Sequence, residues 1–520
     1  MKLIDSKTKE GQKAFLDKGY LLPKYDIDKV RENTLKNPTW IHFGAGNIFR
    51  AFPATVLQHA LNSGKYDKGV IVVEGFDDEI ISKAYKPFDN LSLLTVLKSD
   101  GTVDKEVISS VVESLVLLDG YDEDLKKLRE FFVNPSLQMV SFTITEKGYK
   151  NMDLMGRITA LLNERFKKGA YPVAMTSMDN CSHNGDKLKE GVLSAGKILV
   201  DEGKADPSFM DYLKDNSKVS FPWSMIDKIT PRPDEGVKKM LIEDGFEDAD
   251  VIITEKHTYT AGYVNAEETE YLVIEDDFPN GRPPLEEGGV MFTDKETVDK
   301  VEKMKVCTCL NPLHTAMAIY GCLLGYTSIH EEMKDEDIKG LITKMGYNEG
   351  MKVVVNPGII KPEDFINQVL TKRLPNPFMP DTPQRIACDT SQKLPIRFGE
   401  TISLYEERGL KAGTLKLIPL VIAGYLRYLM GVDDNGSSFE PSPDPLLEEL
   451  MGIMKAVRFA DESTFGNIDS VLDKILRRKD IFKVDLYECG LSDIIKEYFV
   501  SMIKEPKAVR KTLHEIVSNN

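Results

Sequence analysis

The sequence lacks the features that mark secreted, membrane-spanning and metal-dependent proteins. Residues 1–7 contain no apolar core of a signal peptide, and the longest uncharged apolar run, 417–426, is too short to cross a bilayer. Among 520 residues there are only six cysteines and no CxxC pair, which indicates reduced, mostly buried thiols. Cys307 and Cys309 form a lone CxC pair without a second ligand pair at zinc-site spacing. We therefore expect a cytoplasmic protein that needs no metal.

Basic residues are also in the minority. The chain has 67 Lys and Arg against 83 Asp and Glu, a net charge of −16. This balance argues against nucleic acid and anionic membranes as partners. The 42% of apolar residues can fill a sizeable core, and 520 residues are too many for a single one. We expect two or more domains.

A glycine turn follows the first apolar, strand-like run, 40–43. The next apolar run, 69–73, ends at Glu74. Strand, glycine turn, helix, strand and acidic residue form the pattern of a dinucleotide site, in which Gly44 permits the turn and Gly46 lets a pyrophosphate approach. Glu74 would accept ribose hydroxyls and repel a 2′-phosphate, which favours NAD over NADP. The turn reads Gly44, Ala45, Gly46, Asn47, Ile48, Phe49 and Arg50, with Phe49 where the third glycine of the usual fingerprint would stand.

The chain changes character near residue 285. From about 40 to 274, short β-branched runs alternate with helical patterns, which predicts a doubly wound, mostly parallel sheet. Prolines and glycines over 276–294 indicate a linker or an extended crossing, and helical patterns dominate after it. We predict an α/β protein with a Rossmann-like NAD-binding domain over 1–285, which includes a polar lead-in, and a mainly α-helical substrate and catalytic domain over 286–520.

Three polar residues stand directly before or at the start of the apolar run 316–324. Asn311 and His314 are three apart and would share one face of a helix start. A lysine in a dry site, here Lys305, can lose its proton near neutral pH and act as a base. An asparagine amide can donate to a developing oxyanion. The set suits proton removal from an alcohol during hydride transfer. The alternative is a helix start with a polar first turn and a satisfied histidine.

Two further polar segments of the first domain carry possible chemistry. Asn180 follows a strand-like run and could reach a bound carbonyl, while Asn184 or Ser182 could cap the next helix. Asp227 and Lys228 lie inside an apolar segment, where an exposed ion pair is an equally good explanation.

Six sequence blocks, taken in order, resemble the mannitol dehydrogenase family of polyol-specific long-chain dehydrogenases, which also includes hexuronate reductases. The resemblance covers about residues 40–396, which is most of the chain. In that family a bulky residue in place of the third glycine is usual. The blocks are 41–50, 140–149, 178–185, 225–231, 373–377 and 385–395.

The resemblance implies a set of site residues. They are a catalytic lysine at Lys305, oxyanion-binding asparagines at Asn180 and Asn311, His314, a proton-relay Glu302, substrate-binding Arg385 and Lys393, and cofactor contacts at 44–50, Glu74 and Asp227. One spacing departs from the family. Five residues instead of four separate the lysine from the asparagine, so either a helix bulge absorbs the extra residue or the base is Lys303.

The resemblance also implies metal-independent hydride transfer between NAD and a small-molecule substrate, an open-chain sugar acid or a polyol. Arg385 and Lys393 would suit a substrate carboxylate. The chain is more similar to the hexuronate reductases, so we expect fructuronate and mannonate as the substrate pair. Tagaturonate reduction and mannitol oxidation are alternatives. A non-catalytic NAD-binding sensor is a further one, although a sensor needs no base.

Overall fold

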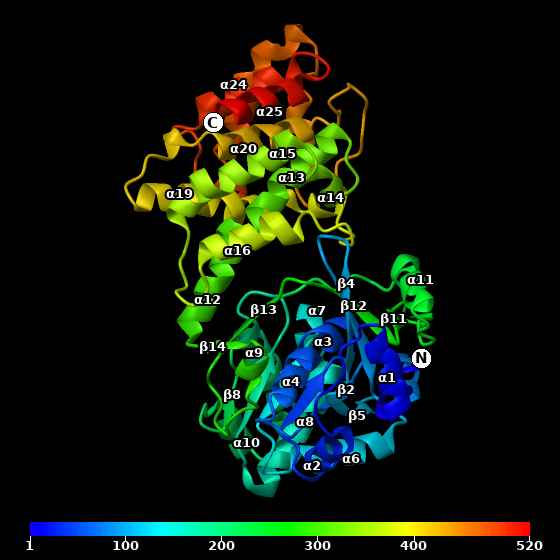
Figure 1. The fold of residues 1–520 in the computed structure, drawn as a ribbon. Helices are drawn as coiled ribbons and strands as arrows, with labels where there is room; N and C mark the ends of the chain where they lie inside the picture. The colour runs from blue at the N-terminus through cyan, green and yellow to red at the C-terminus, as the bar shows by residue number, and fades with distance from the viewer. The chain divides into compact units, whose positions relative to one another are not determined.

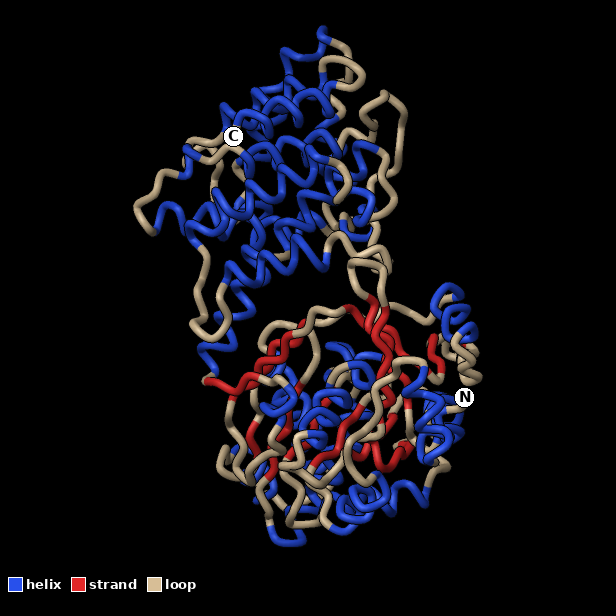
Figure 2. Tube along the Cα trace, viewed as in Figure 1, coloured by secondary structure: helices blue, strands red, loops and turns tan.

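The computed structural model describes all 520 residues and divides them into two units, Met1–Asp299 and Lys300–Asn520. The division falls within helix α12 (Lys295–Met304), after the proline- and glycine-rich segment. All of the strands belong to the first unit, whereas the second unit consists of helices and loops (Figure 2). Each unit has its own core.

The first unit is built on a six-stranded parallel sheet (Figure 1). Its order is β5-β2-β1-β6-β7-β8, and every neighbouring pair is parallel. Numbered along the chain, this is the 3-2-1-4-5-6 order of the doubly wound dinucleotide fold, whose ligand crevice opens where the order reverses, here between β1 and β6. The predicted fold class is confirmed. The strands are β1 (Trp40–Phe43), β2 (Val70–Glu74), β5 (Val111–Val116), β6 (Met139–Phe142), β7 (Val173–Ser177) and β8 (Val219–Ser220).

Three small sheets extend this unit. They are β12 (Tyr263–Glu267), β3 (Ser92–Leu97) and β4 (Val103–Ile108); the hairpin β10 (Val251–Ile253) and β11 (Tyr259–Ala261); and β14 (Met291–Thr293), β13 (Tyr271–Glu275) and β9 (Ser224–Asp227). The helices of the unit are α1 (Lys9–Asp17), α2 (Ile27–Lys36), α3 (Asn47–Ala51), α4 (Pro53–Asn62), α5 (Asp78–Ala84), α6 (Asp122–Phe132), α7 (Thr145–Tyr149), α8 (Met152–Gly169), α9 (Asn184–Asp201), α10 (Ser208–Lys214) and α11 (Glu235–Glu243).

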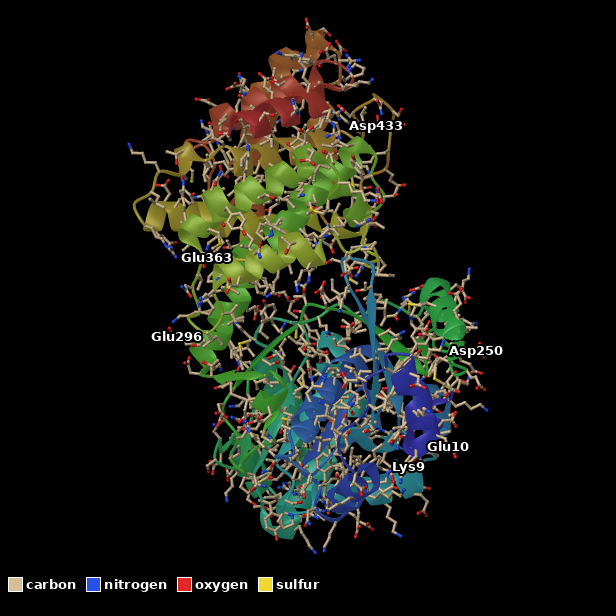
Figure 3. All side chains as sticks on the ribbon, viewed as in Figure 1. Lys9, Glu10, Asp250, Glu296, Glu363 and Asp433 are labelled. Carbon is tan, nitrogen blue, oxygen red and sulfur yellow. The ribbon has the colours of Figure 1, made fainter.

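In the first unit the strands of the sheet are buried, and in both units most charged side chains lie at the surface. Strands β1 and β2 are buried along their whole length, which is typical of a parallel sheet covered on both faces. Exposed charged side chains such as Lys9, Asp250 and Glu363 point outward from their own unit (Figure 3). The sheet therefore forms the centre of the core of the first unit.

The second unit packs around two apolar helices, α13 (Asn311–Leu324) and α20 (Leu417–Tyr428). Every residue of α20 is buried, and the Tyr320 hydroxyl donates to the Leu420 carbonyl at 2.8 Å. The other helices are α14 (Ile329–Glu332), α15 (Glu336–Lys344), α16 (Pro362–Gln368), α17 (Pro383–Ile386), α18 (Thr390–Leu394), α19 (Glu400–Glu407), α21 (Leu447–Met454), α22 (Ile468–Leu476), α23 (Lys479–Phe482), α24 (Ser492–Ile503) and α25 (Ala508–Asn519).

One helical stretch, Lys295–Leu324, is long and apolar enough to cross a membrane by length and composition. In the structure 83% of the 18-residue apolar stretch of this helix is buried inside the protein. Packing within the protein therefore accounts for its apolar residues.

Four π-helices, all in the second unit, interrupt its α-helices. A π-turn holds one more residue than an α-turn, is rare, and occurs frequently at functional sites. One of them covers Lys305–Cys309, between α12 and α13. This π-helix is a helix bulge of the kind that was one of the two explanations for the extra residue between Lys305 and Asn311. The four are η4 (Lys305–Cys309), η5 (Met345–Glu349), η7 (Val369–Arg373) and η8 (Pro395–Gly399).

Candidate active-site residues in the two units

A cavity of about 430 Å³ opens at the carboxyl ends of β1, β2 and β6 in the first unit. Its wall includes Gly44, Gly46, Glu74, Asp77 and Thr145. This is the point where the strand order reverses, and such points bind ligands in doubly wound sheets. The glycine turn and the acidic residue predicted from the sequence therefore meet in one cavity.

The glycine turn has the geometry of a close-approach site. Gly44 has φ +106°, and a Cβ there would lie 2.3 Å from the Thr143 carbonyl oxygen, so only glycine fits. A Cβ on Gly46 would meet nothing within 4 Å, because that side of the turn faces open space. Phe49 stacks on His42 with ring centroids 4.1 Å apart. Burial lowers the pKa of His42 to about 3, so this pair packs the helix on the strand as a neutral unit.

Two other residues of the turn point elsewhere. The Asn47 carboxamide donates to the Tyr259 carbonyl at 3.0 Å. The buried Arg50 guanidinium donates to the Thr260 hydroxyl and the Ala261 carbonyl, and burial lowers its pKa. Both side chains therefore fasten helix α3 to strand β11, and neither is part of the cavity wall.

Glu74 is held by backbone amides on both carboxylate oxygens. Oε2 accepts from the Ala45 amide at 2.9 Å, and Oε1 accepts from Phe76 at 2.8 Å and from Asp77 at 3.2 Å. Burial raises its pKa, and the amide hydrogen bonds act in the opposite direction. Glu74 thus ties the glycine turn to the end of β2.

Asp77 is a wall residue that the sequence analysis missed. Its side chain is buried, and Oδ2 accepts from the hydroxyls of Thr254 at 2.7 Å and Thr258 at 2.6 Å. Its other oxygen, Oδ1, has no hydrogen-bond partner. Asp77 therefore lies in the cavity wall and has one buried carboxylate oxygen without a hydrogen-bond partner. Its position three residues beyond the strand end was the available signal.

A second cavity of the first unit, about 370 Å³, has Asn180, Asp227, Lys228 and Ile48 in its wall. Asp227 ends strand β9 and is buried, whereas Asn180 is exposed. The Lys228 ammonium lies 2.6 Å from Glu270, and its side chain is only 2% exposed. The explanation of this segment as an exposed surface pair is therefore wrong for Lys228.

The loop that carries Asn180 is fixed by its neighbours. The Asp179 carboxylate accepts from the amides of Ile144 and Thr145 and from the Tyr149 hydroxyl. Asn184 donates to the Asp179 carbonyl and exchanges hydrogen bonds with Ser224 of β9. The expected cap is wrong: the residue before α9 is His183, which makes no side-chain cap.

In the second unit the two candidate lysines differ in burial. Lys305 begins the π-helix and is 5% exposed, whereas Lys303 is exposed. Glu302 lies three residues before Lys305 and is half-buried. Asn311 and His314, both half-buried, occupy the first turn of α13. Lys305 is thus the lysine in the drier position.

The cysteines of the π-helix are unsuited to chemistry of their own. Burial raises the pKa of both Cys307 and Cys309 to about 12, so both remain thiols at neutral pH. No group of three or more His, Cys, Asp or Glu side chains in the structure could hold a metal ion. These cysteines serve as small apolar core residues.

The two expected substrate-binding cations already have partners. Arg385 is 72% exposed and pairs with Asp381 at 2.6 Å. The Lys393 ammonium donates to the carbonyls of Ile386 and Cys388, and burial together with nearby Arg397 lowers its pKa. Arg397 itself was missed by the sequence analysis. It lies on π-helix η8 and donates to the Thr315 hydroxyl at 2.5 Å, next to His314.

Comparison with known proteins covers both units. Residues 38–287 match the mannitol dehydrogenase Rossmann domain, and residues 297–496 match the mannitol dehydrogenase C-terminal domain. The chain is 50% identical to the D-mannonate oxidoreductase of Thermotoga maritima over 99% of each chain. It is 28% identical to the polyol:NADP oxidoreductase of Gluconobacter oxydans, over 91% of this chain and 95% of that one.

Solved structures agree with the sequence relatives. A substrate-free D-sorbitol dehydrogenase matches with a TM-score of 0.77 and 25% identity, over 94% of this chain and 97% of its own. Mannitol 2-dehydrogenase of Pseudomonas fluorescens, solved with NAD and D-mannitol, has the same fold, with a TM-score of 0.67 and 24% identity over 96% and 97% of the two chains. The chain belongs to the mannitol dehydrogenase family, and it is a dehydrogenase.

Proposed function

We propose that the protein is an NAD-dependent oxidoreductase that interconverts D-fructuronate and D-mannonate. The observation that carries this proposal is the 50% identity to a D-mannonate oxidoreductase over 99% of each chain. Such coverage includes the cofactor turn and the lysine segment alike. The protein would then act on a small molecule in the cytoplasm, and its six free cysteines support that location.

The cavity of the first unit is the proposed dinucleotide site. Its glycine turn is open on the Gly46 side, and the unused Oδ1 of Asp77 would accept from a ribose hydroxyl. Glu74 and Asp77 together place negative charge in the wall, which disfavours a 2′-phosphate. When bound, the nicotinamide cofactor supplies or takes up the hydride.

Lys305 is the proposed acid and base. In reduction its ammonium gives a proton to the substrate ketone oxygen while the carbonyl carbon gains the hydride, and in oxidation the neutral amine removes that proton. Its burial supports the role, because Lys305 is shielded from water whereas the nearby Lys303 is exposed. Glu302, three residues earlier on the helix, exchanges the proton with solvent.

The remaining residues orient the substrate. The Asn311 carboxamide, in the first turn of α13, donates to the ketone oxygen and stabilises the charge that develops on it. His314, on the same turn as Asn311, orients a neighbouring hydroxyl. Arg385 and Lys393 contact the distal part of the sugar acid.

A substrate panel tests the proposal directly. NADH oxidation is followed spectrophotometrically with fructuronate, tagaturonate, fructose and fructose 6-phosphate. We expect the highest kcat/KM with fructuronate. Faster turnover of tagaturonate or fructose would reassign the enzyme to tagaturonate reduction or mannitol oxidation. NADH binding without turnover of any of the four would indicate a sensor.

A further inference from the structure

Two π-helices, each with a cation, pack on one another in the second unit. Helix η8, with Arg397, contacts η4, which begins at Lys305. One turn after Arg397, the Thr401 hydroxyl donates to the Cys307 carbonyl at 3.3 Å. This bond satisfies a carbonyl of η4 and fixes the two segments side by side.

The guanidinium of Arg397 is held against the first turn of α13. Its NH1 group donates to the Thr315 hydroxyl at 2.5 Å, and that hydroxyl donates to the Asn311 carbonyl at 3.1 Å. Thr315 directly follows His314 in the chain. Arg397 of η8 therefore contacts the α13 turn that carries two of the proposed active-site residues, Asn311 and His314.

Other buried arginines of this chain show what a structural role looks like. Arg165 donates to five backbone carbonyls, those of Phe132, Asn134, Leu137, Tyr171 and Pro172. Arg427 donates to three, those of Met502, Val432 and Asp433. The one hydrogen bond of Arg397 is the bond to Thr315. A guanidinium has five N–H donors, so most of those of Arg397 are available to a ligand.

No carboxylate neutralises Arg397. Burial lowers its pKa to about 10, which leaves it charged at neutral pH, and no anion opposes that shift. Arg385, by contrast, pairs with Asp381, and Lys393 donates to two carbonyls. A half-buried cation without an anion is costly, and the cost is offset when an anionic ligand binds.

We propose that Arg397 binds the carboxylate of the sugar acid and thereby selects acidic over neutral substrates. This inference rests on the proposed function. A planar guanidinium forms two parallel hydrogen bonds with a carboxylate, whereas the terminal hydroxymethyl group of a neutral ketose offers no charge to pair with. The ligand class is therefore an open-chain hexuronate or hexonate.

A thermodynamic cycle tests the pairing of Arg397 with the substrate carboxylate. Wild type and Arg397→Gln are assayed with fructuronate and with its neutral carboxamide. For fructuronate, kcat/KM is expected to fall about tenfold to a hundredfold, mainly through KM, as for a charged hydrogen bond. For the carboxamide the loss should be about twofold or less. Where the carboxamide is not turned over, inhibition constants of mannonate and mannonamide complete the same cycle.

Control variants separate the pairing from folding defects. Arg408→Gln removes an exposed arginine at the end of α19 and should leave both substrates unaffected. Arg397→Lys keeps the charge but not the planar fork, and should recover part of the fructuronate activity. If Arg397→Gln is unstable in thermal unfolding, Arg397→Lys carries the test, with a larger loss for fructuronate than for the carboxamide.

Three outcomes would overturn the inference. Equal losses with the acid and the carboxamide would make Arg397 a structural residue. A selective loss in Arg385→Gln without one in Arg397→Gln would assign the carboxylate to Arg385. A wild type that reduces fructuronate and its carboxamide equally well would show no carboxylate recognition. Failure of the wild type with every hexuronate would instead disprove the proposed function itself.

Discussion

The glycine turn of the first unit, residues 44–50, and the segment around Lys305 in the second unit are held in place in different ways. The turn lies where parallel strands end, and backbone amides hold its acidic residue, Glu74, at both oxygens. The lysine segment lies on a helix whose register is changed by a π-turn at Lys305–Cys309. The carboxyl ends of parallel strands lie at one edge of the sheet, however many residues connect the strands. On a helix, by contrast, one inserted residue changes the direction of every side chain before it relative to those after it.

The largest effect is expected from replacing Lys305, at the start of the π-helix. Lys305→Ala should lower kcat by about a hundredfold to ten-thousandfold, because general acid-base catalysis contributes that much. Steady-state kinetics measures the loss, and fluorescence titration should show that NADH still binds. Lys303→Ala is the matched control and should stay near wild type. If Lys303→Ala is inactive and Lys305→Ala is active, the base is Lys303 and not Lys305.

A smaller effect is expected at the strand ends. Asp77→Asn should reduce the preference for NADH over NADPH by about tenfold, because one negative charge leaves the cavity wall that repels a 2′-phosphate. Glu74→Gln should reduce the preference for NADH less than Asp77→Asn does. It should lower the melting temperature more than Asp77→Asn does, because the Glu74 oxygens accept hydrogen bonds from three backbone amides. Parallel NADH and NADPH kinetics with thermal unfolding measures both. An unchanged cofactor preference in Asp77→Asn would argue against Asp77 at the ribose.

A buried glutamate of the second unit contrasts with Glu74. Glu332 is fully buried, neither of its carboxylate oxygens has a partner, and burial raises its pKa from 4.5 to about 9. The folded state thus keeps a proton that the unfolded state releases, and stability is lost as the pH rises between those two values. Glu332→Met should raise the unfolding free energy by about 1–3 kcal/mol at pH 8, and by less at pH 5.

Denaturant unfolding at both pH values measures the effect of Glu332. Glu331→Met is the matched control: Glu331 is exposed and pairs with Lys334, so its replacement should change stability much less than Glu332→Met does. A Glu332→Met variant that is less stable than wild type at pH 8 would show that the carboxyl is stabilised in the fold.

The smallest effect is expected from chelation. A lysine base makes a Lewis acid unnecessary, and no side-chain cluster of the chain could hold a metal. Prolonged dialysis against EDTA should leave the initial rate within about 10% of an undialysed sample. Loss of activity that a divalent ion restores would contradict the lysine mechanism.

The sequence predicted those parts of the fold and of the candidate site that depend on residues close together in the chain. Alternating strand and helix patterns predicted the parallel sheet, and the spacing from Gly44 to Glu74 identified residues that line one cavity at the strand ends. Asp77 was missed because its orientation depends on Thr254 and Thr258, about 180 residues later in the chain. Arg397 was missed for the same reason, since Thr315 holds it from another helix. Long-range contacts of this kind leave no periodic signal.

The π-helix at Lys305–Cys309 can also be regarded as a one-residue insertion that is accommodated without ending the helix. One residue of an α-helix advances the chain by about 1.5 Å and turns it by about 100°. Removing one residue from the turn would rotate Glu302 and Lys305 by that angle relative to Asn311. An alignment gap inside a helix is usually treated as an error. Here the extra residue has a physical location, the π-helix at Lys305–Cys309, and it changes the direction of the Lys305 side chain relative to Asn311.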